Sequence, residues 1–304
     1  MHKQEAILST EEQALRDSLA LHIAVMPVMD CFPIYYAWQT GIIDTAQHDI
    51  CLHTYLAQMD VDTAIQRGTV NLAYTDLIRT LRLAPKIDKL HVIMRGHENW
   101  SLICQKGKRV KKQNQLKEKM IATCRLSAVD YWCDAMVDSL KTNDSDIYRP
   151  QINDVQLRAD MMRTNLIDAA LMPWPYNQWM LQQGLRCLAT SSEKDPKLAC
   201  WTIHADSTLT PKKDSLLHQF THIYNQAVAE LNRNNRPDAV QHILTNIYHI
   251  PTEIVDSLTL PTFHKADFPK DEEIDVAEAW LTSKDRMPKG VDKTRLIQTK
   301  YLRK

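Results

Sequence analysis

The sequence predicts an α/β protein with two lobes, each a mainly parallel sheet flanked by helices. Two observations support this prediction. Short apolar runs alternate with helical patterns along the chain, an order typical of parallel sheets with right-handed crossovers. The chain also has 304 residues, a length that favours two lobes over a single core.

The first part of the chain predicts three strand–helix units in succession. The apolar run 21–28 is expected to be a buried strand, and a short loop joins it to a helix over 33–41 that ends at Gly41. Further strands are expected over 50–55 and 70–75, and further helices over 1–19, 59–67 and 76–83. These units predict one sheet with its helices.

The middle of the chain predicts a second α/β unit. It begins at about residue 98, after a further strand expected over 89–94, and its own expected strands cover 100–104, 120–123, 167–172 and 186–189. Its expected helices cover 127–140, 154–164 and 176–183. The charge-rich segment 107–115 is predicted to be a solvated loop.

The last part of the chain is expected to return to the first unit. After a polar link, a strand is predicted over 200–204, and helices are predicted over 214–232, 237–247, 252–258 and 272–283. The path therefore crosses between the lobes twice, near Met94 and near Trp201. We expect one discontinuous lobe, 1–97 plus 199–304, with the second lobe, 98–198, inserted into it.

The composition excludes several classes of function. Lys and Arg together number 37, as do Asp and Glu, so no broad basic field favours nucleic acid as a partner. The six glycines form neither a dinucleotide fingerprint nor a phosphate-binding loop. The seven cysteines match no zinc pattern, and no Ser/His/Asp or Cys/His order is evident among the scattered histidines. We expect no catalytic residues, no metal and no cofactor.

Five segments resemble one known family in the order in which that family has them. They are Val25-Met-Pro-Val-Met-Asp30 with Pro33-Ile-Tyr35, Gly41-Ile-Ile-Asp44, Asp62-Thr-Ala-Ile-Gln-Arg-Gly68 followed by Leu72-Ala-Tyr-Thr-Asp76, Ile167-Asp-Ala-Ala-Leu-Met-Pro173 with Pro175-Tyr176, and Leu258-Thr-Leu-Pro-Thr-Phe263. The chain thereby resembles the type II periplasmic solute-binding proteins. The most similar branch serves nitrate, taurine, aliphatic sulfonates and thiamine-precursor pyrimidines.

This resemblance implies a role in transport. The chain would be the substrate-binding component of an ABC importer, would capture a small organic solute by closing its two lobes on a hinge, and would deliver that solute to a membrane permease. It would not be an enzyme. The alternative is a cytoplasmic enzyme on the same fold, of the menaquinone- or thiamine-pathway type.

The sequence bears on location in one respect. No apolar run approaches the roughly 18 residues that span a bilayer, and residues 1–20 are charged, without the apolar stretch of a secretion signal. We expect a periplasmic or cell-surface protein held by a lipid anchor if an export signal has been removed ahead of Met1. Otherwise we expect a cytoplasmic protein.

The ligand is expected in the cleft between the lobes, at strand ends and helix N-termini. Free N–H groups and the helix dipole favour an anion or a polar group there. The predicted ligand-binding residues are Asp30, Cys31, Phe32, Tyr35, Thr75, Asp76, Arg125, Ser127 and Trp174.

Four of these residues also have a structural interpretation. Asp30 would bind a ligand amine or cap the next helix, and Asp76 would face the ligand or cap its own helix. Arg125 would bind a carboxylate, sulfonate or phosphate, or form a salt bridge. Trp174 would stack on a flat ring or pack in the core. The aromatic residues near the cleft favour a flat, weakly charged solute over nitrate.

Overall fold

The first sheet contains strands from both ends of the chain. The computed structural model describes residues 10–44, 48–106, 115–138, 147–205, 209–233, 237–288 and 292–302. The strands of this five-stranded sheet are β1 (Leu21–Val25), β2 (Ile50–Thr54), β3 (Leu72–Asp76), β4 (Leu90–Arg95) and β9 (Ala199–His204), in the spatial order β2-β1-β3-β9-β4. Both of its pairings with β9 are antiparallel, while β1 pairs in parallel with β2 and β3.

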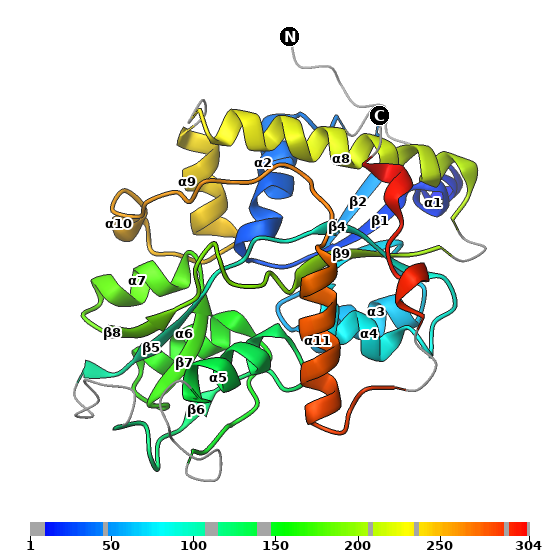
Figure 1. Ribbon diagram of the computed structural model, residues 1–304. Helices are drawn as coiled ribbons and strands as arrows, with labels where there is room; N and C mark the ends of the chain where they lie inside the picture. The colour runs from blue at the N-terminus through cyan, green and yellow to red at the C-terminus, as the bar shows by residue number, and fades with distance from the viewer. Residues whose placement is uncertain are drawn as a thin grey trace.

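The second sheet comes from the middle of the chain. Its strands are β5 (Trp100–Cys104), β6 (Ile121–Ala122), β7 (Ala169–Pro173) and β8 (Arg186–Thr190), in the order β6-β7-β5-β8. Strand β5 runs antiparallel to β7 and β8, and β6 pairs in parallel with β7. Figure 1 shows this sheet below and to the left of the first one.

Each sheet therefore contains one strand that runs against the others, β9 in the first and β5 in the second. The reason is the path of the chain. The chain leaves the first sheet at the C-terminal end of β4, which faces the second sheet. The returning β9 starts at that same end of the sheet, so it must run in the opposite direction. The remaining strands of each sheet share one direction, and the mainly parallel α/β fold with two sheets is confirmed.

Helices cover both faces of the first sheet. On one face lie α2 (Phe32–Thr40), α8 (Pro211–Leu231) and α9 (Pro237–Asn246), and on the other lie α3 (Gln58–Gln66), α4 (Leu77–Leu83) and α11 (Asp271–Ser283). Helix α2 ends at Gly41 because this residue adopts a left-handed conformation, φ 78°. The remaining short helices near this sheet are α1 (Thr10–Leu19), α10 (Thr252–Val255), η1 (Met29–Cys31), η5 (Lys293–Arg295) and η6 (Thr299–Tyr301).

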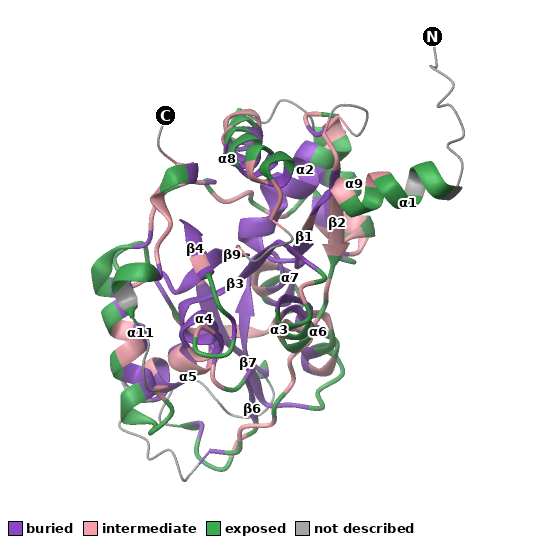
Figure 2. Ribbon diagram, turned by 90° about the vertical axis from the view of Figure 1, so that its right-hand side faces the viewer, coloured by how far each residue is buried: buried purple, intermediate pink, exposed green. Residues whose placement is uncertain are grey.

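The second sheet is also covered on both faces. Helix α5 (Ala128–Asp138) packs on β5 and β7, while α6 (Val155–Arg163) and α7 (Tyr176–Gln182) pack on the same sheet beside each other. Their side chains join two different buried clusters, which places them on opposite faces. Figure 2 shows the strands of both sheets largely buried and the outer sides of α8 and α11 exposed.

Most predicted elements are present, with shorter bounds in three places. The first strand ends at Val25 because Pro27 and the turn η1 follow it, β6 has only two residues, and α10 is a single turn. Residues 107–114 of the predicted loop and parts of the helices over 1–19 and 127–140 lie outside the described residues. Among the described helices, none is both long and apolar enough to cross a bilayer.

Buried acidic side chains hold the two segments in which the chain crosses between the sheets. Asp30 accepts hydrogen bonds from the backbone N–H groups of His97 (2.8 Å) and Glu98 (3.1 Å) in the crossing from β4 to β5. Glu273 of α11 accepts from the backbone N–H of Lys197 (2.9 Å), in the crossing from β8 to β9. Both crossing segments are thus bound to buried carboxylates of the first sheet's elements.

Candidate functional site

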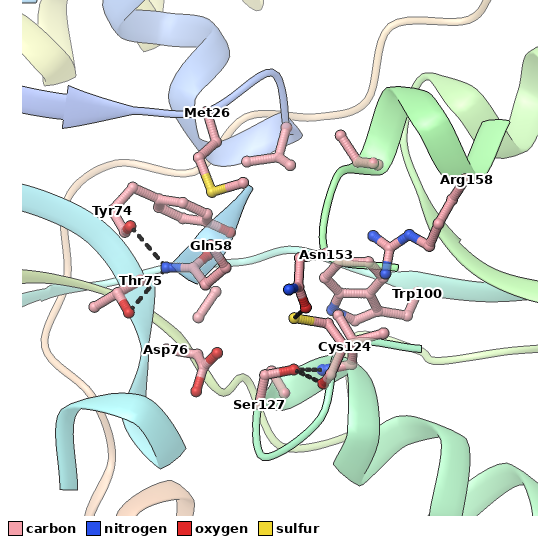
Figure 3. A pocket seen from close by; sticks show the side chains of 15 residues that line it. Met26, Gln58, Tyr74, Thr75, Asp76, Trp100, Cys124, Ser127, Asn153 and Arg158 are labelled. Carbon is pink, nitrogen blue, oxygen red and sulfur yellow. Dashed lines mark hydrogen bonds between the residues drawn. The ribbon is translucent and has the colours of Figure 1, made fainter. Parts of the chain in front are cut away.

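A cavity of about 40 Å³ lies between the two sheets, and we call it the interlobe cavity (Figure 3). Both sheets contribute to its lining, which consists of Met26, Val28, Gln58, Tyr74, Thr75, Asp76 and Ala199 on one side and Trp100, Cys124, Ser127, Ala128, Val129, Asn153, Val155 and Arg158 on the other. Its volume is enough for a few water molecules. The structure is therefore a closed arrangement of the two lobes.

Arg158 is the most unusual residue of the interlobe cavity. It lies on α6, is only 2% exposed, and points its guanidinium group into the cavity. Within the described parts of the chain, its Nε and NH1 groups have no hydrogen-bond partner. Burial lowers the pKa of this guanidinium, although Cys124 and Asp154 partly oppose that shift. Arginine keeps its proton in proteins, so the cavity contains a buried cation with unused donors.

The N-terminus of α5 forms a second polar wall. Ser127 caps this helix, since its Oγ accepts a hydrogen bond from the backbone N–H of Val129 at 3.2 Å. The backbone N–H of Ala128, at the start of α5, lowers the pKa of the Asp76 carboxyl group, which comes from the end of β3 in the other sheet. The partial positive charge of a helix N-terminus favours an anion at this place, and Asp76 is an acidic side chain that lines the same cavity.

Asp76 also caps its own helix. Its Oδ1 accepts from the backbone N–H of Arg79 at 2.9 Å, which confirms the capping interpretation made from the sequence. Burial raises the pKa of Asp76 to about 6, against the lowering effect of Arg79 and of the backbone N–H groups. A carboxyl group in this state can exchange its proton near neutral pH.

A further set of contacts joins the lobes beside the cavity. The Arg79 guanidinium pairs with Asp62 on its own side and donates through NH2 to Cys124 Sγ at 3.0 Å on the other side. The Cys124 thiol in turn donates to Asn153 Oδ1 at 3.1 Å. Gln58 orients the opposite wall by donating to Thr75 Oγ1 at 3.1 Å. Polar groups from four segments thus converge on one small volume.

Three of the nine residues predicted from the sequence line the interlobe cavity, namely Thr75, Asp76 and Ser127. The other six lie outside it. Arg125 is exposed at the surface, although it is only two residues from Ser127. Asp30 is buried beneath the cleft, where it accepts from Tyr74 (3.1 Å) and from the crossing segment, and it caps no helix.

The remaining four predicted residues belong to the core. Trp174 and Phe32 meet edge to face at 5.2 Å between ring centroids, and Trp174 Nε1 donates to the carbonyl of Thr259 at 3.1 Å. Tyr35 lies 3.2 Å from the Thr54 hydroxyl, and Cys31 Sγ accepts from the backbone N–H of Met26 at 3.4 Å. Neither Tyr35 nor Tyr36 faces the cavity, and both are buried.

Arg158 is not among the residues predicted from the sequence, although the sequence carries a signal for it. On α6 the residues Val155, Arg158, Ala159 and Met162 share one buried face. An arginine at helical spacing among apolar residues is unusual, because a buried charge is costly unless it is paired. This position could have been identified by asking which charged residues fall on apolar helix faces.

Comparison with solved structures identifies the fold. The chain has the two-lobed fold of the type II periplasmic binding proteins. The aliphatic sulphonate binding protein of Escherichia coli is 16% identical, with 93% of this chain and 99% of that chain covered and a TM-score of 0.72. The alkanesulfonate-binding protein of Xanthomonas axonopodis pv. citri, bound to MOPS, is 17% identical, with 92% and 96% covered and a TM-score of 0.73.

A nitrate-binding protein has the same fold. The periplasmic nitrate-binding protein of Synechocystis PCC 6803 is 12% identical, with 91% of this chain and 84% of that chain covered and a TM-score of 0.69. No protein-family model matches the sequence, and no curated protein matches it.

Proposed function

We propose that this protein is the solute-binding component of an ABC importer and that it captures a small organic anion between its lobes. The single observation that carries the proposal is Arg158, a buried cation with unused donors that faces the interlobe cavity. A guanidinium group recognises carboxylates, sulfonates and phosphates with paired hydrogen bonds. The names of the structural neighbours, which bind sulfonates and nitrate, support the same class of solute.

The proposal assigns roles to the residues around Arg158. The anionic group of the solute would pair with Arg158 and receive hydrogen bonds from Asn153 and from the N-terminus of α5. Thr75, Asp76 and Ser127 would complete the polar wall, and Trp100 would pack on the apolar part of the solute. The charge of Arg158 favours an anion over the weakly charged ring that the sequence suggested.

Capture would require the lobes to move. A volume of about 40 Å³ is too small for an alkanesulfonate, so the closed arrangement must open before a solute can enter. The lobes would be 1–97 plus 199–304 and 98–198, and the two crossing segments would act as the hinge. The proposal includes a membrane permease as partner and a periplasmic or cell-surface location, with a lipid anchor as the attachment.

The experiment is a binding screen with matched variants. Calorimetry and thermal shift would be measured with ethanesulfonate, taurine, MOPS, nitrate and a pyrimidine precursor of thiamine. Arg158→Met should weaken binding of the anion about 10- to 100-fold, because it removes a charged hydrogen-bond donor. The control is Arg163→Met, which removes an exposed arginine from the same helix and should leave the affinity unchanged.

Two results would overturn the proposal. One is the absence of binding to every anion in the screen. The other is an Arg158→Met protein that binds the anion as tightly as the natural sequence does. A folding defect would not obscure this reading, because replacing an unpaired buried charge by an apolar side chain should maintain or raise the melting temperature.

A further inference from the structure

We propose that His97, Glu193 and His264 bind a divalent transition-metal ion of the zinc type. One ring nitrogen of each histidine and one carboxylate oxygen of Glu193 lie within 4.8 Å of one another. Two imidazoles and a carboxylate are a ligand set that zinc accepts, with water in the fourth position. The sequence predicted no metal because these residues are far apart along the chain.

The three ligands come from three segments that meet beside the hinge. His97 is in the crossing from β4 to β5, Glu193 is in the crossing from β8 to β9, and His264 is in the stretch between α10 and α11. Figure 1 shows that stretch passing from α10 across α2 and into the upper end of α11. A metal ion here would join all three segments.

The two histidine rings lie face to face. The rings of His97 and His264 are stacked, with centroids 4.2 Å apart and planes inclined by 14°. Tetrahedral zinc with bonds of about 2.0–2.1 Å needs ligand atoms roughly 3.3 Å apart, so ligand atoms within 4.8 Å of one another must approach by up to about 1.5 Å. Because a metal ion lies in the plane of each imidazole that binds it, the His264 ring must also turn out of the stack. His97 is buried, whereas His264 and Glu193 are partly exposed and can make this adjustment.

An independent observation is the unsatisfied nitrogen of His97. Its Nε2 is buried and has no hydrogen-bond partner within the described ranges, in a residue only 8% exposed. A buried polar atom without a partner is costly and uncommon. We take Nε2 as the ligating atom, because a metal ion would supply the partner that the protein does not.

The carboxylate of Glu193 is held in a suitable orientation. Asn99 donates to its Oε1 at 2.8 Å, while its Oε2 lies 3.8 Å from His264 Nε2. Hydrogen bonds to a ligating group commonly fix its position in metal sites. Lys197 lies 3.8 Å from Oε1, and its positive charge would make this site weaker than a four-ligand structural site.

The test is a titration of the full chain, without a histidine tag, with Co²⁺ and Zn²⁺ after removal of metal by a chelator. Co²⁺ absorption and calorimetry would report the site. His264→Ala and Glu193→Gln should each weaken binding at least about tenfold and abolish the rise in melting temperature that Zn²⁺ gives. The control is His242→Ala, an exposed histidine on α9, which should change neither quantity.

The proposal is overturned if neither metal binds, or if binding is the same in His264→Ala, Glu193→Gln and the control. The two ligand variants alter exposed side chains and should fold, so the test does not depend on His97. The metal proposal is tested independently of the proposed solute binding, because metal binding is measured without any anion present. If hinge closure is also correct, metal and solute should alter each other's affinity by the same factor.

Discussion

The backbone N–H of Ala128, across the cleft from the sheet that carries Asp76, lowers the pKa of the Asp76 carboxyl group. The same carboxylate caps α4 through the N–H of Arg79. One buried acidic group thus caps α4 and lines the same cavity as the N-terminus of α5, which belongs to the other sheet. The anionic part of a solute would be expected beside it, at that N-terminus.

Replacing this carboxyl group should change how stability depends on pH. Because the pKa of Asp76 is raised to about 6, the folded state binds more protons than the unfolded state between about pH 4 and 6, and stability falls as the pH rises through this window. Asp76→Asn keeps a capping side chain and removes the titration. The natural protein should therefore lose about 2–3 kcal/mol of stability between pH 4 and pH 7 that the variant does not lose. The free energy of unfolding of Asp76→Asn minus that of the natural sequence should rise by this amount.

Urea unfolding at pH 4, 5, 6 and 7 would measure this difference. Asp238→Asn, which removes an exposed charge from the first turn of α9, controls for the general loss of a negative charge at a helix N-terminus. A difference between Asp76→Asn and the natural sequence that stays constant with pH would contradict the prediction.

Gly96 should tolerate no side chain. A Cβ atom at this position would lie 2.5 Å from Asp30 Oδ2 and 2.6 Å from the Cβ of Ala199. Gly96→Ala should cost about 3 kcal/mol of folding free energy, because the new methyl group pushes the buried Asp30 carboxylate away from the crossing segment that it binds. Gly41→Ala is the comparison, because its Cβ meets open space and only the left-handed backbone opposes it, at a cost of about 1 kcal/mol. Equal losses in the two variants would contradict this account.

Trp174 should prove a stabilising residue. Its indole packs on Phe32 and donates to Thr259, so Trp174→Phe loses one buried hydrogen bond and some packing, about 1–3 kcal/mol together. Chemical unfolding would measure the loss, and calorimetry would show whether anion affinity changes. A variant with unchanged stability and abolished binding would return Trp174 to the ligand site that the sequence predicted.

Cysteine labelling should report opening of the cleft. Cys187 is exposed, whereas Cys124 and Cys133 are buried in the closed arrangement. Since only Cys124 of these two lines the interlobe cavity, hinge opening should expose it to a maleimide sooner than Cys133, and a bound alkanesulfonate should slow its reaction. Mass spectrometry of digested samples would give the rates. Equal rates for Cys124 and Cys133 would argue against an opening hinge.

The sequence predicted the fold better than the site, for a physical reason. Runs such as 21–28 and 167–172 are apolar because they are buried within a sheet, and helix caps such as Asp76 act through neighbours in sequence. Arg158, Asn153 and Gln58 meet only when two sheets pack together, and nothing close to them in sequence encodes that meeting. Local reasoning at strand ends found Thr75, Asp76 and Ser127, but it also selected Asp30 and Trp174, which lie at strand ends and face inward.

The place of β9 between β3 and β4 has a consequence for synthesis. A ribosome makes β1 to β4 first, yet the seam between β3 and β4 stays empty until residues 199–204 emerge. The later-made sheet can pair all its strands while the earlier one still lacks an inner strand. The first sheet therefore stays incomplete during synthesis, with the edges of β3 and β4 unpaired. Aggregation or a chaperone would act on these edges.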